Sequence, residues 1–200
     1  MTRRIAIIVE GATEKVLERT LRVYLNEKLS GQMPKLRFIS EDGRIPTGDK
    51  LRRDVFRLLE RDYDSVIALT DVYTGSRPPE FENAAEAKQK MSEWVGDEPR
   101  FHPHAAQYEF EAWLLPYWTT IQRLAGSSRN PPSPTPENVN HDKPPAKHLA
   151  ELFLSGRRRA YVKTRDGAAI LRGQDLDVSA NACPELRAFL DTILRESATP

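Results

Sequence analysis

The 200-residue sequence contains a single cysteine, Cys183, and only four histidines. One cysteine excludes an internal disulfide and any zinc site built from several thiolates. No apolar run approaches the ~18 residues that a membrane span requires, and the apolar run behind the basic N-terminus is too short for a signal peptide. We therefore expect a cytoplasmic protein that does not enter a membrane.

An excess of charge of either sign is also lacking, because 30 basic and 29 acidic side chains leave a formal net charge of +1. Overall charge thus implies no nucleic-acid partner, and only local clusters of basic residues can indicate one. Hydrophobic residues at 39% and charged residues at 30% are typical of a folded globular protein. The sequence has no Ser-His-Asp pattern, P-loop or dinucleotide-binding motif, which argues against those classes of enzyme.

Strands and helices are predicted to alternate along the chain. Apolar or alternating runs predict strands over 3–9, 36–40, 65–71 and 100–107, with helical periodicity after each of the first three. This order predicts an α/β fold with a central, mostly parallel sheet flanked by helices. Three regions are expected: a core over 1–125, a Pro-rich loop over 126–145, and a C-terminal helical extension over 146–200 that packs on the core.

Carboxylates follow three of the predicted strands. Glu10 comes directly after the first apolar run, Asp71 ends the third, and Glu109 and Glu111 follow the fourth. In open α/β sheets, ligands bind beyond the carboxyl ends of the strands. Oxygen ligands of this kind suit Mg²⁺ or Mn²⁺, and an ion would relieve the repulsion between the carboxylates. The pattern therefore suggests a metal site formed by these four residues.

Each of these carboxylates also has an ordinary structural interpretation. Glu10 precedes a predicted helix and would be a favourable partner for its dipole. Asp71 would suit a turn in which its side chain bonds to its own backbone. Glu109 and Glu111 are acids in the first turn of a helix. The metal hypothesis depends on the three positions occurring together, and it requires the carboxylates to converge.

The motifs around these residues resemble TOPRIM domains. The segment "VEGATEK" (9–15) follows the first apolar strand, "TDVYTG" (70–75) the third, and "QYEFEAWLL" (107–115) the fourth. They are most similar to an uncharacterised bacterial TOPRIM-like family. Further blocks of that family are matched by "PENVNHDKPPAKHL", "YVKTRDGAAI" and "ACPELRAFLDTI", so that the resemblance extends over nearly the whole chain.

The resemblance implies a TOPRIM-like Rossmannoid fold and a divalent-metal-dependent nuclease that cleaves phosphodiester bonds in DNA or RNA. Members of this family are often encoded beside ATPases in phage-defence loci. This implies an effector that acts with a separate ATPase in trans.

One departure from the TOPRIM pattern matters, because Tyr73 stands where the second aspartate of Asp-x-Asp is expected. This family shares the tyrosine, which removes one ligand that Glu109 or Glu111 would replace.

By the same resemblance, Lys163 is the candidate catalytic lysine that offsets charge on the phosphate, beside Glu10, Asp71 and Glu111. A solvated lysine in a basic segment is the alternative. Asp166-Gly167 predicts a turn.

The remaining candidates are two histidines, the single cysteine and the local basic clusters. Two histidines on one predicted strand, His102 and His104, are too few for a zinc site and are expected on the surface of an edge strand. Cys183 is expected to be a small buried side chain. The basic residues proposed to contact nucleic acid are Arg157, Arg158, Arg159 and Lys163, and a second group on a predicted helix is Arg52, Arg53, Arg57 and Arg61.

Two functions remain open from the sequence. The first is the metal-dependent nuclease. The second is a catalytically inactive TOPRIM-like module that binds or regulates a partner ATPase, in which the loss of Asp-x-Asp leaves too few ligands. The oligomeric state is open as well, including a homo-oligomer.

Overall fold

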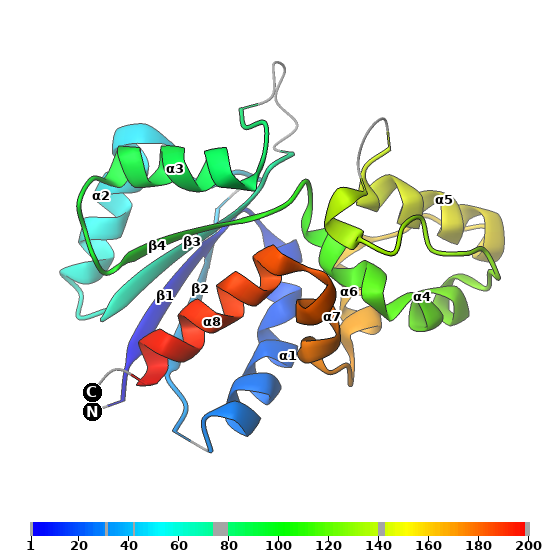
Figure 1. The fold of residues 1–200 in the computed structure, drawn as a ribbon, viewed down its shortest axis with the longest axis horizontal. Coiled ribbons are helices and arrows are strands. Elements are labelled where there is room, and N and C mark those ends of the chain that lie inside the picture. Colours follow the sequence, from blue (N-terminus) through cyan, green and yellow to red (C-terminus); the bar gives the residue numbers. More distant parts are fainter. Residues whose placement is uncertain (1, 31, 42, 74–79, 140–142, 199–200) are drawn as a thin grey trace.

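The protein is an α/β domain in which a four-stranded, all-parallel sheet lies between two layers of helices (Figure 1). The computed structural model describes residues 2–30, 32–41, 43–73, 80–139 and 143–198, without the side chains of residues 12–15. The strands are β1 (Arg4–Val9), β2 (Lys35–Ser40), β3 (Ser65–Asp71) and β4 (Phe101–Ala106). Their order is β2-β1-β3-β4, so β2 and β4 are the edges. The predicted fold class is confirmed.

Eight α-helices are described. They are α1 (Ala12–Lys28), α2 (Gly48–Leu59), α3 (Ala84–Val95), α4 (Trp118–Ala125), α5 (Pro145–Arg157), α6 (Lys163–Leu171), α7 (Leu176–Ala182) and α8 (Pro184–Ala198). Two 3₁₀ helices, η1 (Phe110–Tyr117) and η2 (Pro136–Asn138), complete the described elements. Of the described helices, α1, α2 and α3 follow the first three strands, as helical crossovers in a parallel sheet require. No described helix is long and apolar enough to cross a membrane.

The central strand β1 explains why the sheet is covered on both faces. Its side chains alternate between two hydrophobic clusters, with Ile5, Ile7 and Val9 in one and Ala6 and Ile8 in the other. Helices α1 and α8 cover the first face, and α2 and α3 cover the second (Figure 1). Burial on both faces accounts for the nearly continuous apolar run in the sequence.

The C-terminal helices share the hydrophobic cluster of β1 rather than forming a core of their own. Leu149, Ile170 and Phe189 are fully buried in the same cluster as Ile7. Gly156 brings α5 close to the end of α4, because a Cβ there would lie 2.0 Å from the carbonyl oxygen of Ala125. The division into a core, a Pro-rich loop and an extension stays a prediction.

The histidines of β4 correct one expectation. Both face α8, but His104 is only 6% exposed, and its Nε2 lies 3.1 Å from Oγ1 of Thr192. Helix α8 therefore covers this part of the edge strand, and the prediction of a surface position is wrong for His104. Burial lowers the pKa of His104 to about 3, so its imidazole is neutral at physiological pH. Cys183 is buried, as expected.

Candidate active site

The ends of β1, β3 and β4 lie side by side, because these three strands are neighbours and run in parallel. Glu10 directly follows β1, and Asp71 is the last residue of β3. Glu109 and Glu111 follow β4 and lie at the start of η1. The parallel sheet thus brings all four predicted carboxylates to one edge.

Glu10 and Asp71 are joined by a direct hydrogen bond. The backbone N–H of Asp71 donates to Oε1 of Glu10 at 3.0 Å, and the hydroxyl of Thr70 donates to the same oxygen. Both carboxylates are nearly buried, with 8% of Glu10 and 7% of Asp71 exposed. Backbone and hydroxyl donors therefore fix the Glu10 side chain against the end of β3.

Asp71 in turn orients the segment that follows β4. Its Oδ1 accepts a hydrogen bond of 2.8 Å from the backbone N–H of Phe110. Tyr108, two residues earlier, has a φ of +67°, in the left-handed region that a non-glycine residue seldom adopts. This conformation turns the chain between β4 and η1, where Glu109 and Glu111 lie.

Glu109 and Glu111 have different environments. Glu109 is partly exposed, and its Oε2 accepts a hydrogen bond of 2.8 Å from the backbone N–H of Ala146 in the first turn of α5. Glu111 is fully buried, and its oxygens lie 3.1 and 3.2 Å from Nζ of Lys163. The structure therefore distinguishes two residues that the sequence left equivalent.

Lys163 is the cation of this cluster. It begins α6, and its side chain keeps 43% of its surface exposed while its ammonium reaches Glu111. Burial lowers the pKa of Lys163, but the negative charges of Glu111, Asp71 and Glu109 outweigh that effect and raise it. Burial raises the pKa of Glu111, and Lys163 opposes the shift. Lys163 is thus paired with one of the predicted carboxylates, and its catalytic role stays a prediction.

The start of α6 is held by Asp166, which corrects the turn expected at Asp166-Gly167. Both residues lie inside α6. The Asp166 carboxylate accepts two hydrogen bonds from Arg159, at 2.8 and 2.9 Å, and one of 2.7 Å from the backbone N–H of Val162. Burial alone would raise the Asp166 pKa, but these donors and Arg165 lower it. A short polar pair can predict either a turn or a capped helix, and here the arginines stabilise the helix.

The three arginines of the basic run predicted to contact nucleic acid have different environments. Arg159 is paired with Asp166 and stacks on Phe153, with its guanidinium carbon 4.7 Å from the ring centre. Arg157 donates to the carbonyl oxygen of Leu124 at 3.4 Å, and Arg158 has a left-handed backbone after α5. A contact of these residues with nucleic acid stays a prediction.

Two participants were missed at the sequence level. Thr70 bonds directly to Glu10, and the side chain of Tyr161 places its hydroxyl in the protein interior. Burial, followed by the charge of Glu111, raises the pKa of Tyr161. Neither residue belongs to a charged pattern, so no signal in one sequence indicated them. The side chains of Thr13, Glu14 and Lys15 in the first motif lie outside the described residues.

The donor chemistry of the cluster fits a hard divalent ion. All four side chains offer carboxylate oxygens, and Oε1 of Glu111 is buried without a well-aligned hydrogen bond, although Lys163 lies within ion-pair distance. The geometry of these side chains fits an ion less well than their chemistry does. Among the described residues, no three metal-ligating side chains converge on a single point. The convergence required by the metal hypothesis is therefore not found there, and the ligand set remains part of the proposal below.

Comparison with known proteins gives the chain a family. The family model of DUF4276, a domain of unknown function, matches residues 9–194. The chain belongs to this family. This agrees with the expected family of unknown function, and the TOPRIM relationship belongs to the proposal below. No curated protein matches this DUF4276 chain.

Solved structures share the fold of this DUF4276 domain. The C-terminal region of the Burkholderia pseudomallei OLD protein is 17% identical, with a TM-score of 0.56 over 99% of this chain and 100% of the other. The C-terminal region of the Xanthomonas campestris pv. campestris OLD protein is 16% identical, with a TM-score of 0.50 over 98% of this chain and 97% of the other. At this identity the likeness shows a common fold.

Proposed function

We propose that this DUF4276 protein is a divalent-metal-dependent nuclease. The observation that carries the proposal is the placement of four carboxylates at or after the ends of three neighbouring strands, with one lysine paired to Glu111. Such a site has the components that phosphodiester cleavage requires: oxygen ligands for Mg²⁺ or Mn²⁺ and a cation for the developing charge on phosphate. The motif resemblance to TOPRIM domains and the fold shared with the OLD C-terminal regions support it.

In this proposal Glu10, Asp71 and Glu109 hold the metal. Glu10 and Asp71 are fixed by the hydrogen bonds described above, and Glu109 is the more accessible of the two carboxylates after β4. Glu111 instead fixes the ammonium of Lys163 by their ion pair. A bound ion would polarise the phosphate and lower the pKa of a water molecule bound to it. The Lys163 side chain would then stabilise negative charge on the phosphate.

The proposed partner is a separately encoded ATPase, and the proposed setting is defence against phage. Both rest on the resemblance in sequence.

A second candidate function is an inactive binding or regulatory module for that ATPase. Tyr73 in place of the second aspartate, and the pairing of Glu111 with Lys163, favour this alternative because both reduce the number of available ligands.

The two functions differ in a cleavage assay. The purified protein is incubated with supercoiled plasmid, single-stranded DNA and RNA, each in the presence of Mn²⁺ or Mg²⁺. The nuclease predicts cleavage of at least one substrate that excess EDTA stops and added Mn²⁺ restores. An effector that requires activation by an ATPase would be silent alone, so the assay is repeated with the ATPase encoded nearest to the gene. Absence of cleavage in both settings supports the binding module.

A further inference from the structure

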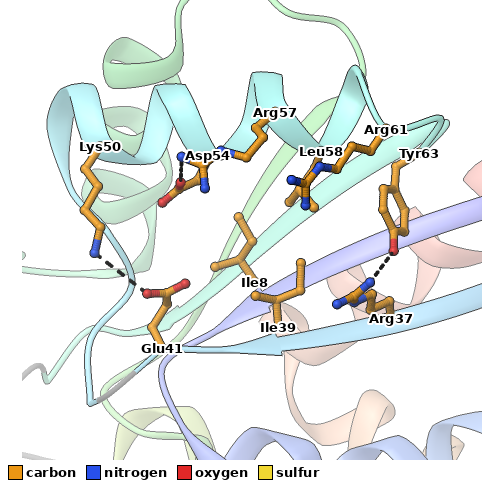
Figure 2. A pocket seen from close by; sticks show the side chains of 10 residues that line it. All are labelled: Ile8, Arg37, Ile39, Glu41, Lys50, Asp54, Arg57, Leu58, Arg61 and Tyr63. Atoms are coloured by element: carbon orange, nitrogen blue, oxygen red, sulfur yellow. Dashed lines mark hydrogen bonds and ion pairs between the residues drawn. The ribbon is translucent and has the colours of Figure 1, made fainter.

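A cavity lies between helix α2 and the sheet face of β1 and β2 (Figure 2). Its volume is about 340 Å³, within the range of ~300–1,000 Å³ typical of sites for small molecules. Helix α2 covers this side of the sheet, and β2 is an edge strand (Figure 1).

The floor of the cavity is apolar. It is formed by Ile8 of β1 and Ile39 of β2, and Leu58 of α2 lies on the opposite side of the cavity (Figure 2). Ile39 and Leu58 are partly exposed. Tyr63 lies at one end, and its hydroxyl accepts a hydrogen bond of 3.5 Å from Arg37. A flat apolar group such as a nucleobase would remove this surface from water.

The walls of the cavity carry more positive than negative charge. Four basic side chains line it, Arg37, Lys50, Arg57 and Arg61, against the two carboxylates of Glu41 and Asp54. Both carboxylates are already paired, Glu41 with Lys50 at 3.9 Å and Asp54 with Arg57 at 3.1 Å.

The other two cations are not neutralised in this way. Within the described parts of the chain, neither Arg37 nor Arg61 has a carboxylate within ion-pair distance. Both side chains are exposed. Guanidinium groups of this kind bind phosphate oxygens through two parallel hydrogen bonds.

One end of the cavity, at Glu41, lies near the backbone of Glu10. Glu41 directly follows β2, and its backbone N–H donates to the carbonyl oxygen of Val9 at 2.8 Å. The N–H of Gly43 donates to the carbonyl oxygen of Glu10 at 2.9 Å. A chain of nucleotides lying in the cavity would therefore lead towards Glu10.

We propose that this cavity holds one nucleotide of a single-stranded nucleic acid, with its base on the apolar floor and its phosphates on Arg37 and Arg61. The inference rests on the proposed function, since a strand that continues from the cavity past Glu41 would approach the carboxylates that would cleave it. A single strand is required because the bases of a duplex are stacked and paired and cannot reach the floor.

The test measures binding without cleavage. Fluorescence anisotropy is recorded with labelled single-stranded DNA and RNA 12-mers in EDTA, for the wild type and for the double variant Arg37→Gln/Arg61→Gln. The variant is expected to bind at least tenfold more weakly. The slope of log K against log salt concentration should also fall by about 1.4, since each lost phosphate contact to a single strand contributes about 0.7.

A matched control separates this cavity from general electrostatic attraction. Arg123→Gln/Arg172→Gln removes the same two charges from exposed positions in α4 and directly after α6, outside the cavity, and is expected to change the affinity less than twofold. Equal losses in the two double variants would overturn the proposal, as would unchanged binding in Arg37→Gln/Arg61→Gln or no binding by the wild type. A free mononucleotide that binds as tightly as the 12-mers would show a small-molecule site and would also overturn it.

The outcome is separable from that of the proposed nuclease. If the cavity variant loses binding while the wild type cleaves nothing, the inference holds and the nuclease proposal fails. If the wild type cleaves and the cavity variant still binds normally, the inference alone fails.

Discussion

Glu10→Gln is expected to keep the fold and to reduce the rate of metal-dependent cleavage by a factor of about 10³ or more. This corresponds to an increase of about 4 kcal/mol in the activation barrier. The glutamine oxygen can still accept the hydrogen bonds from Asp71 and Thr70, so that the local structure is retained. What the variant loses is the negative charge that would hold a divalent ion. Asp71→Asn is expected to behave alike, because its amide oxygen can still accept from the N–H of Phe110.

Glu93→Gln is the matched control for these substitutions. It also removes one carboxylate, but from the exposed surface of α3, and it is expected to leave the rate within twofold of the wild type. Initial rates are measured on the substrate that the wild type cleaves, with circular dichroism as the check of folding. A folded Glu10→Gln protein that cleaves at the wild-type rate would exclude Glu10 as a ligand.

Lys163→Met is expected to lower the free energy of unfolding by about 3 kcal/mol at pH 7, the lower end of the range for breaking a buried ion pair. Glu111 is fully buried and would lose its counter-charge, whereas Lys163 is partly exposed, which limits the loss. The double variant Lys163→Met/Glu111→Gln removes the buried charge and should recover most of the stability. Urea unfolding of the wild type, both single variants and the double variant measures the coupling between the two residues.

The pH dependence of Lys163→Met gives a second check. Burial raises the pKa of Glu111 in the fold, and the loss of Lys163 would raise it further. A buried acid with a raised pKa destabilises the fold above that pKa and ceases to do so below the pKa of the unfolded chain. The difference in stability between Lys163→Met and the wild type should therefore shrink as the pH falls towards 4. A difference that is constant with pH would show that the loss comes from packing rather than from charge.

The fold was largely predictable because parallel strands have a strong signature. A strand covered on both faces must be apolar at nearly every position, and Ile5 to Val9 and Ser65 to Leu69 have that pattern. Helices α6 and α7 were less accessible to prediction. Helix α6 is short, and its start depends on hydrogen bonds from Arg159 and Val162 to Asp166, which no local periodicity reveals.

The candidate site was predictable in its members but not in its arrangement. Position after a strand was sufficient to select Glu10 and Asp71, since the sheet itself brings strand ends together. The difference between Glu109 and Glu111 depends on the path of η1 and on where α6 places Lys163, and both are set by tertiary packing. The contribution of Thr70 and the conformation of Tyr108 likewise depend on contacts between distant elements.

Calorimetric titration with Mn²⁺ tests most directly whether these carboxylates form a metal site, and it does not require an activating partner. The account predicts micromolar-to-millimolar binding by the wild type, abolished in Glu10→Gln and in Asp71→Asn and weakened more by Glu109→Gln than by Glu111→Gln. Glu93→Gln should bind as the wild type does. Binding that survives both Glu10→Gln and Asp71→Asn, or no binding by the wild type, would contradict it.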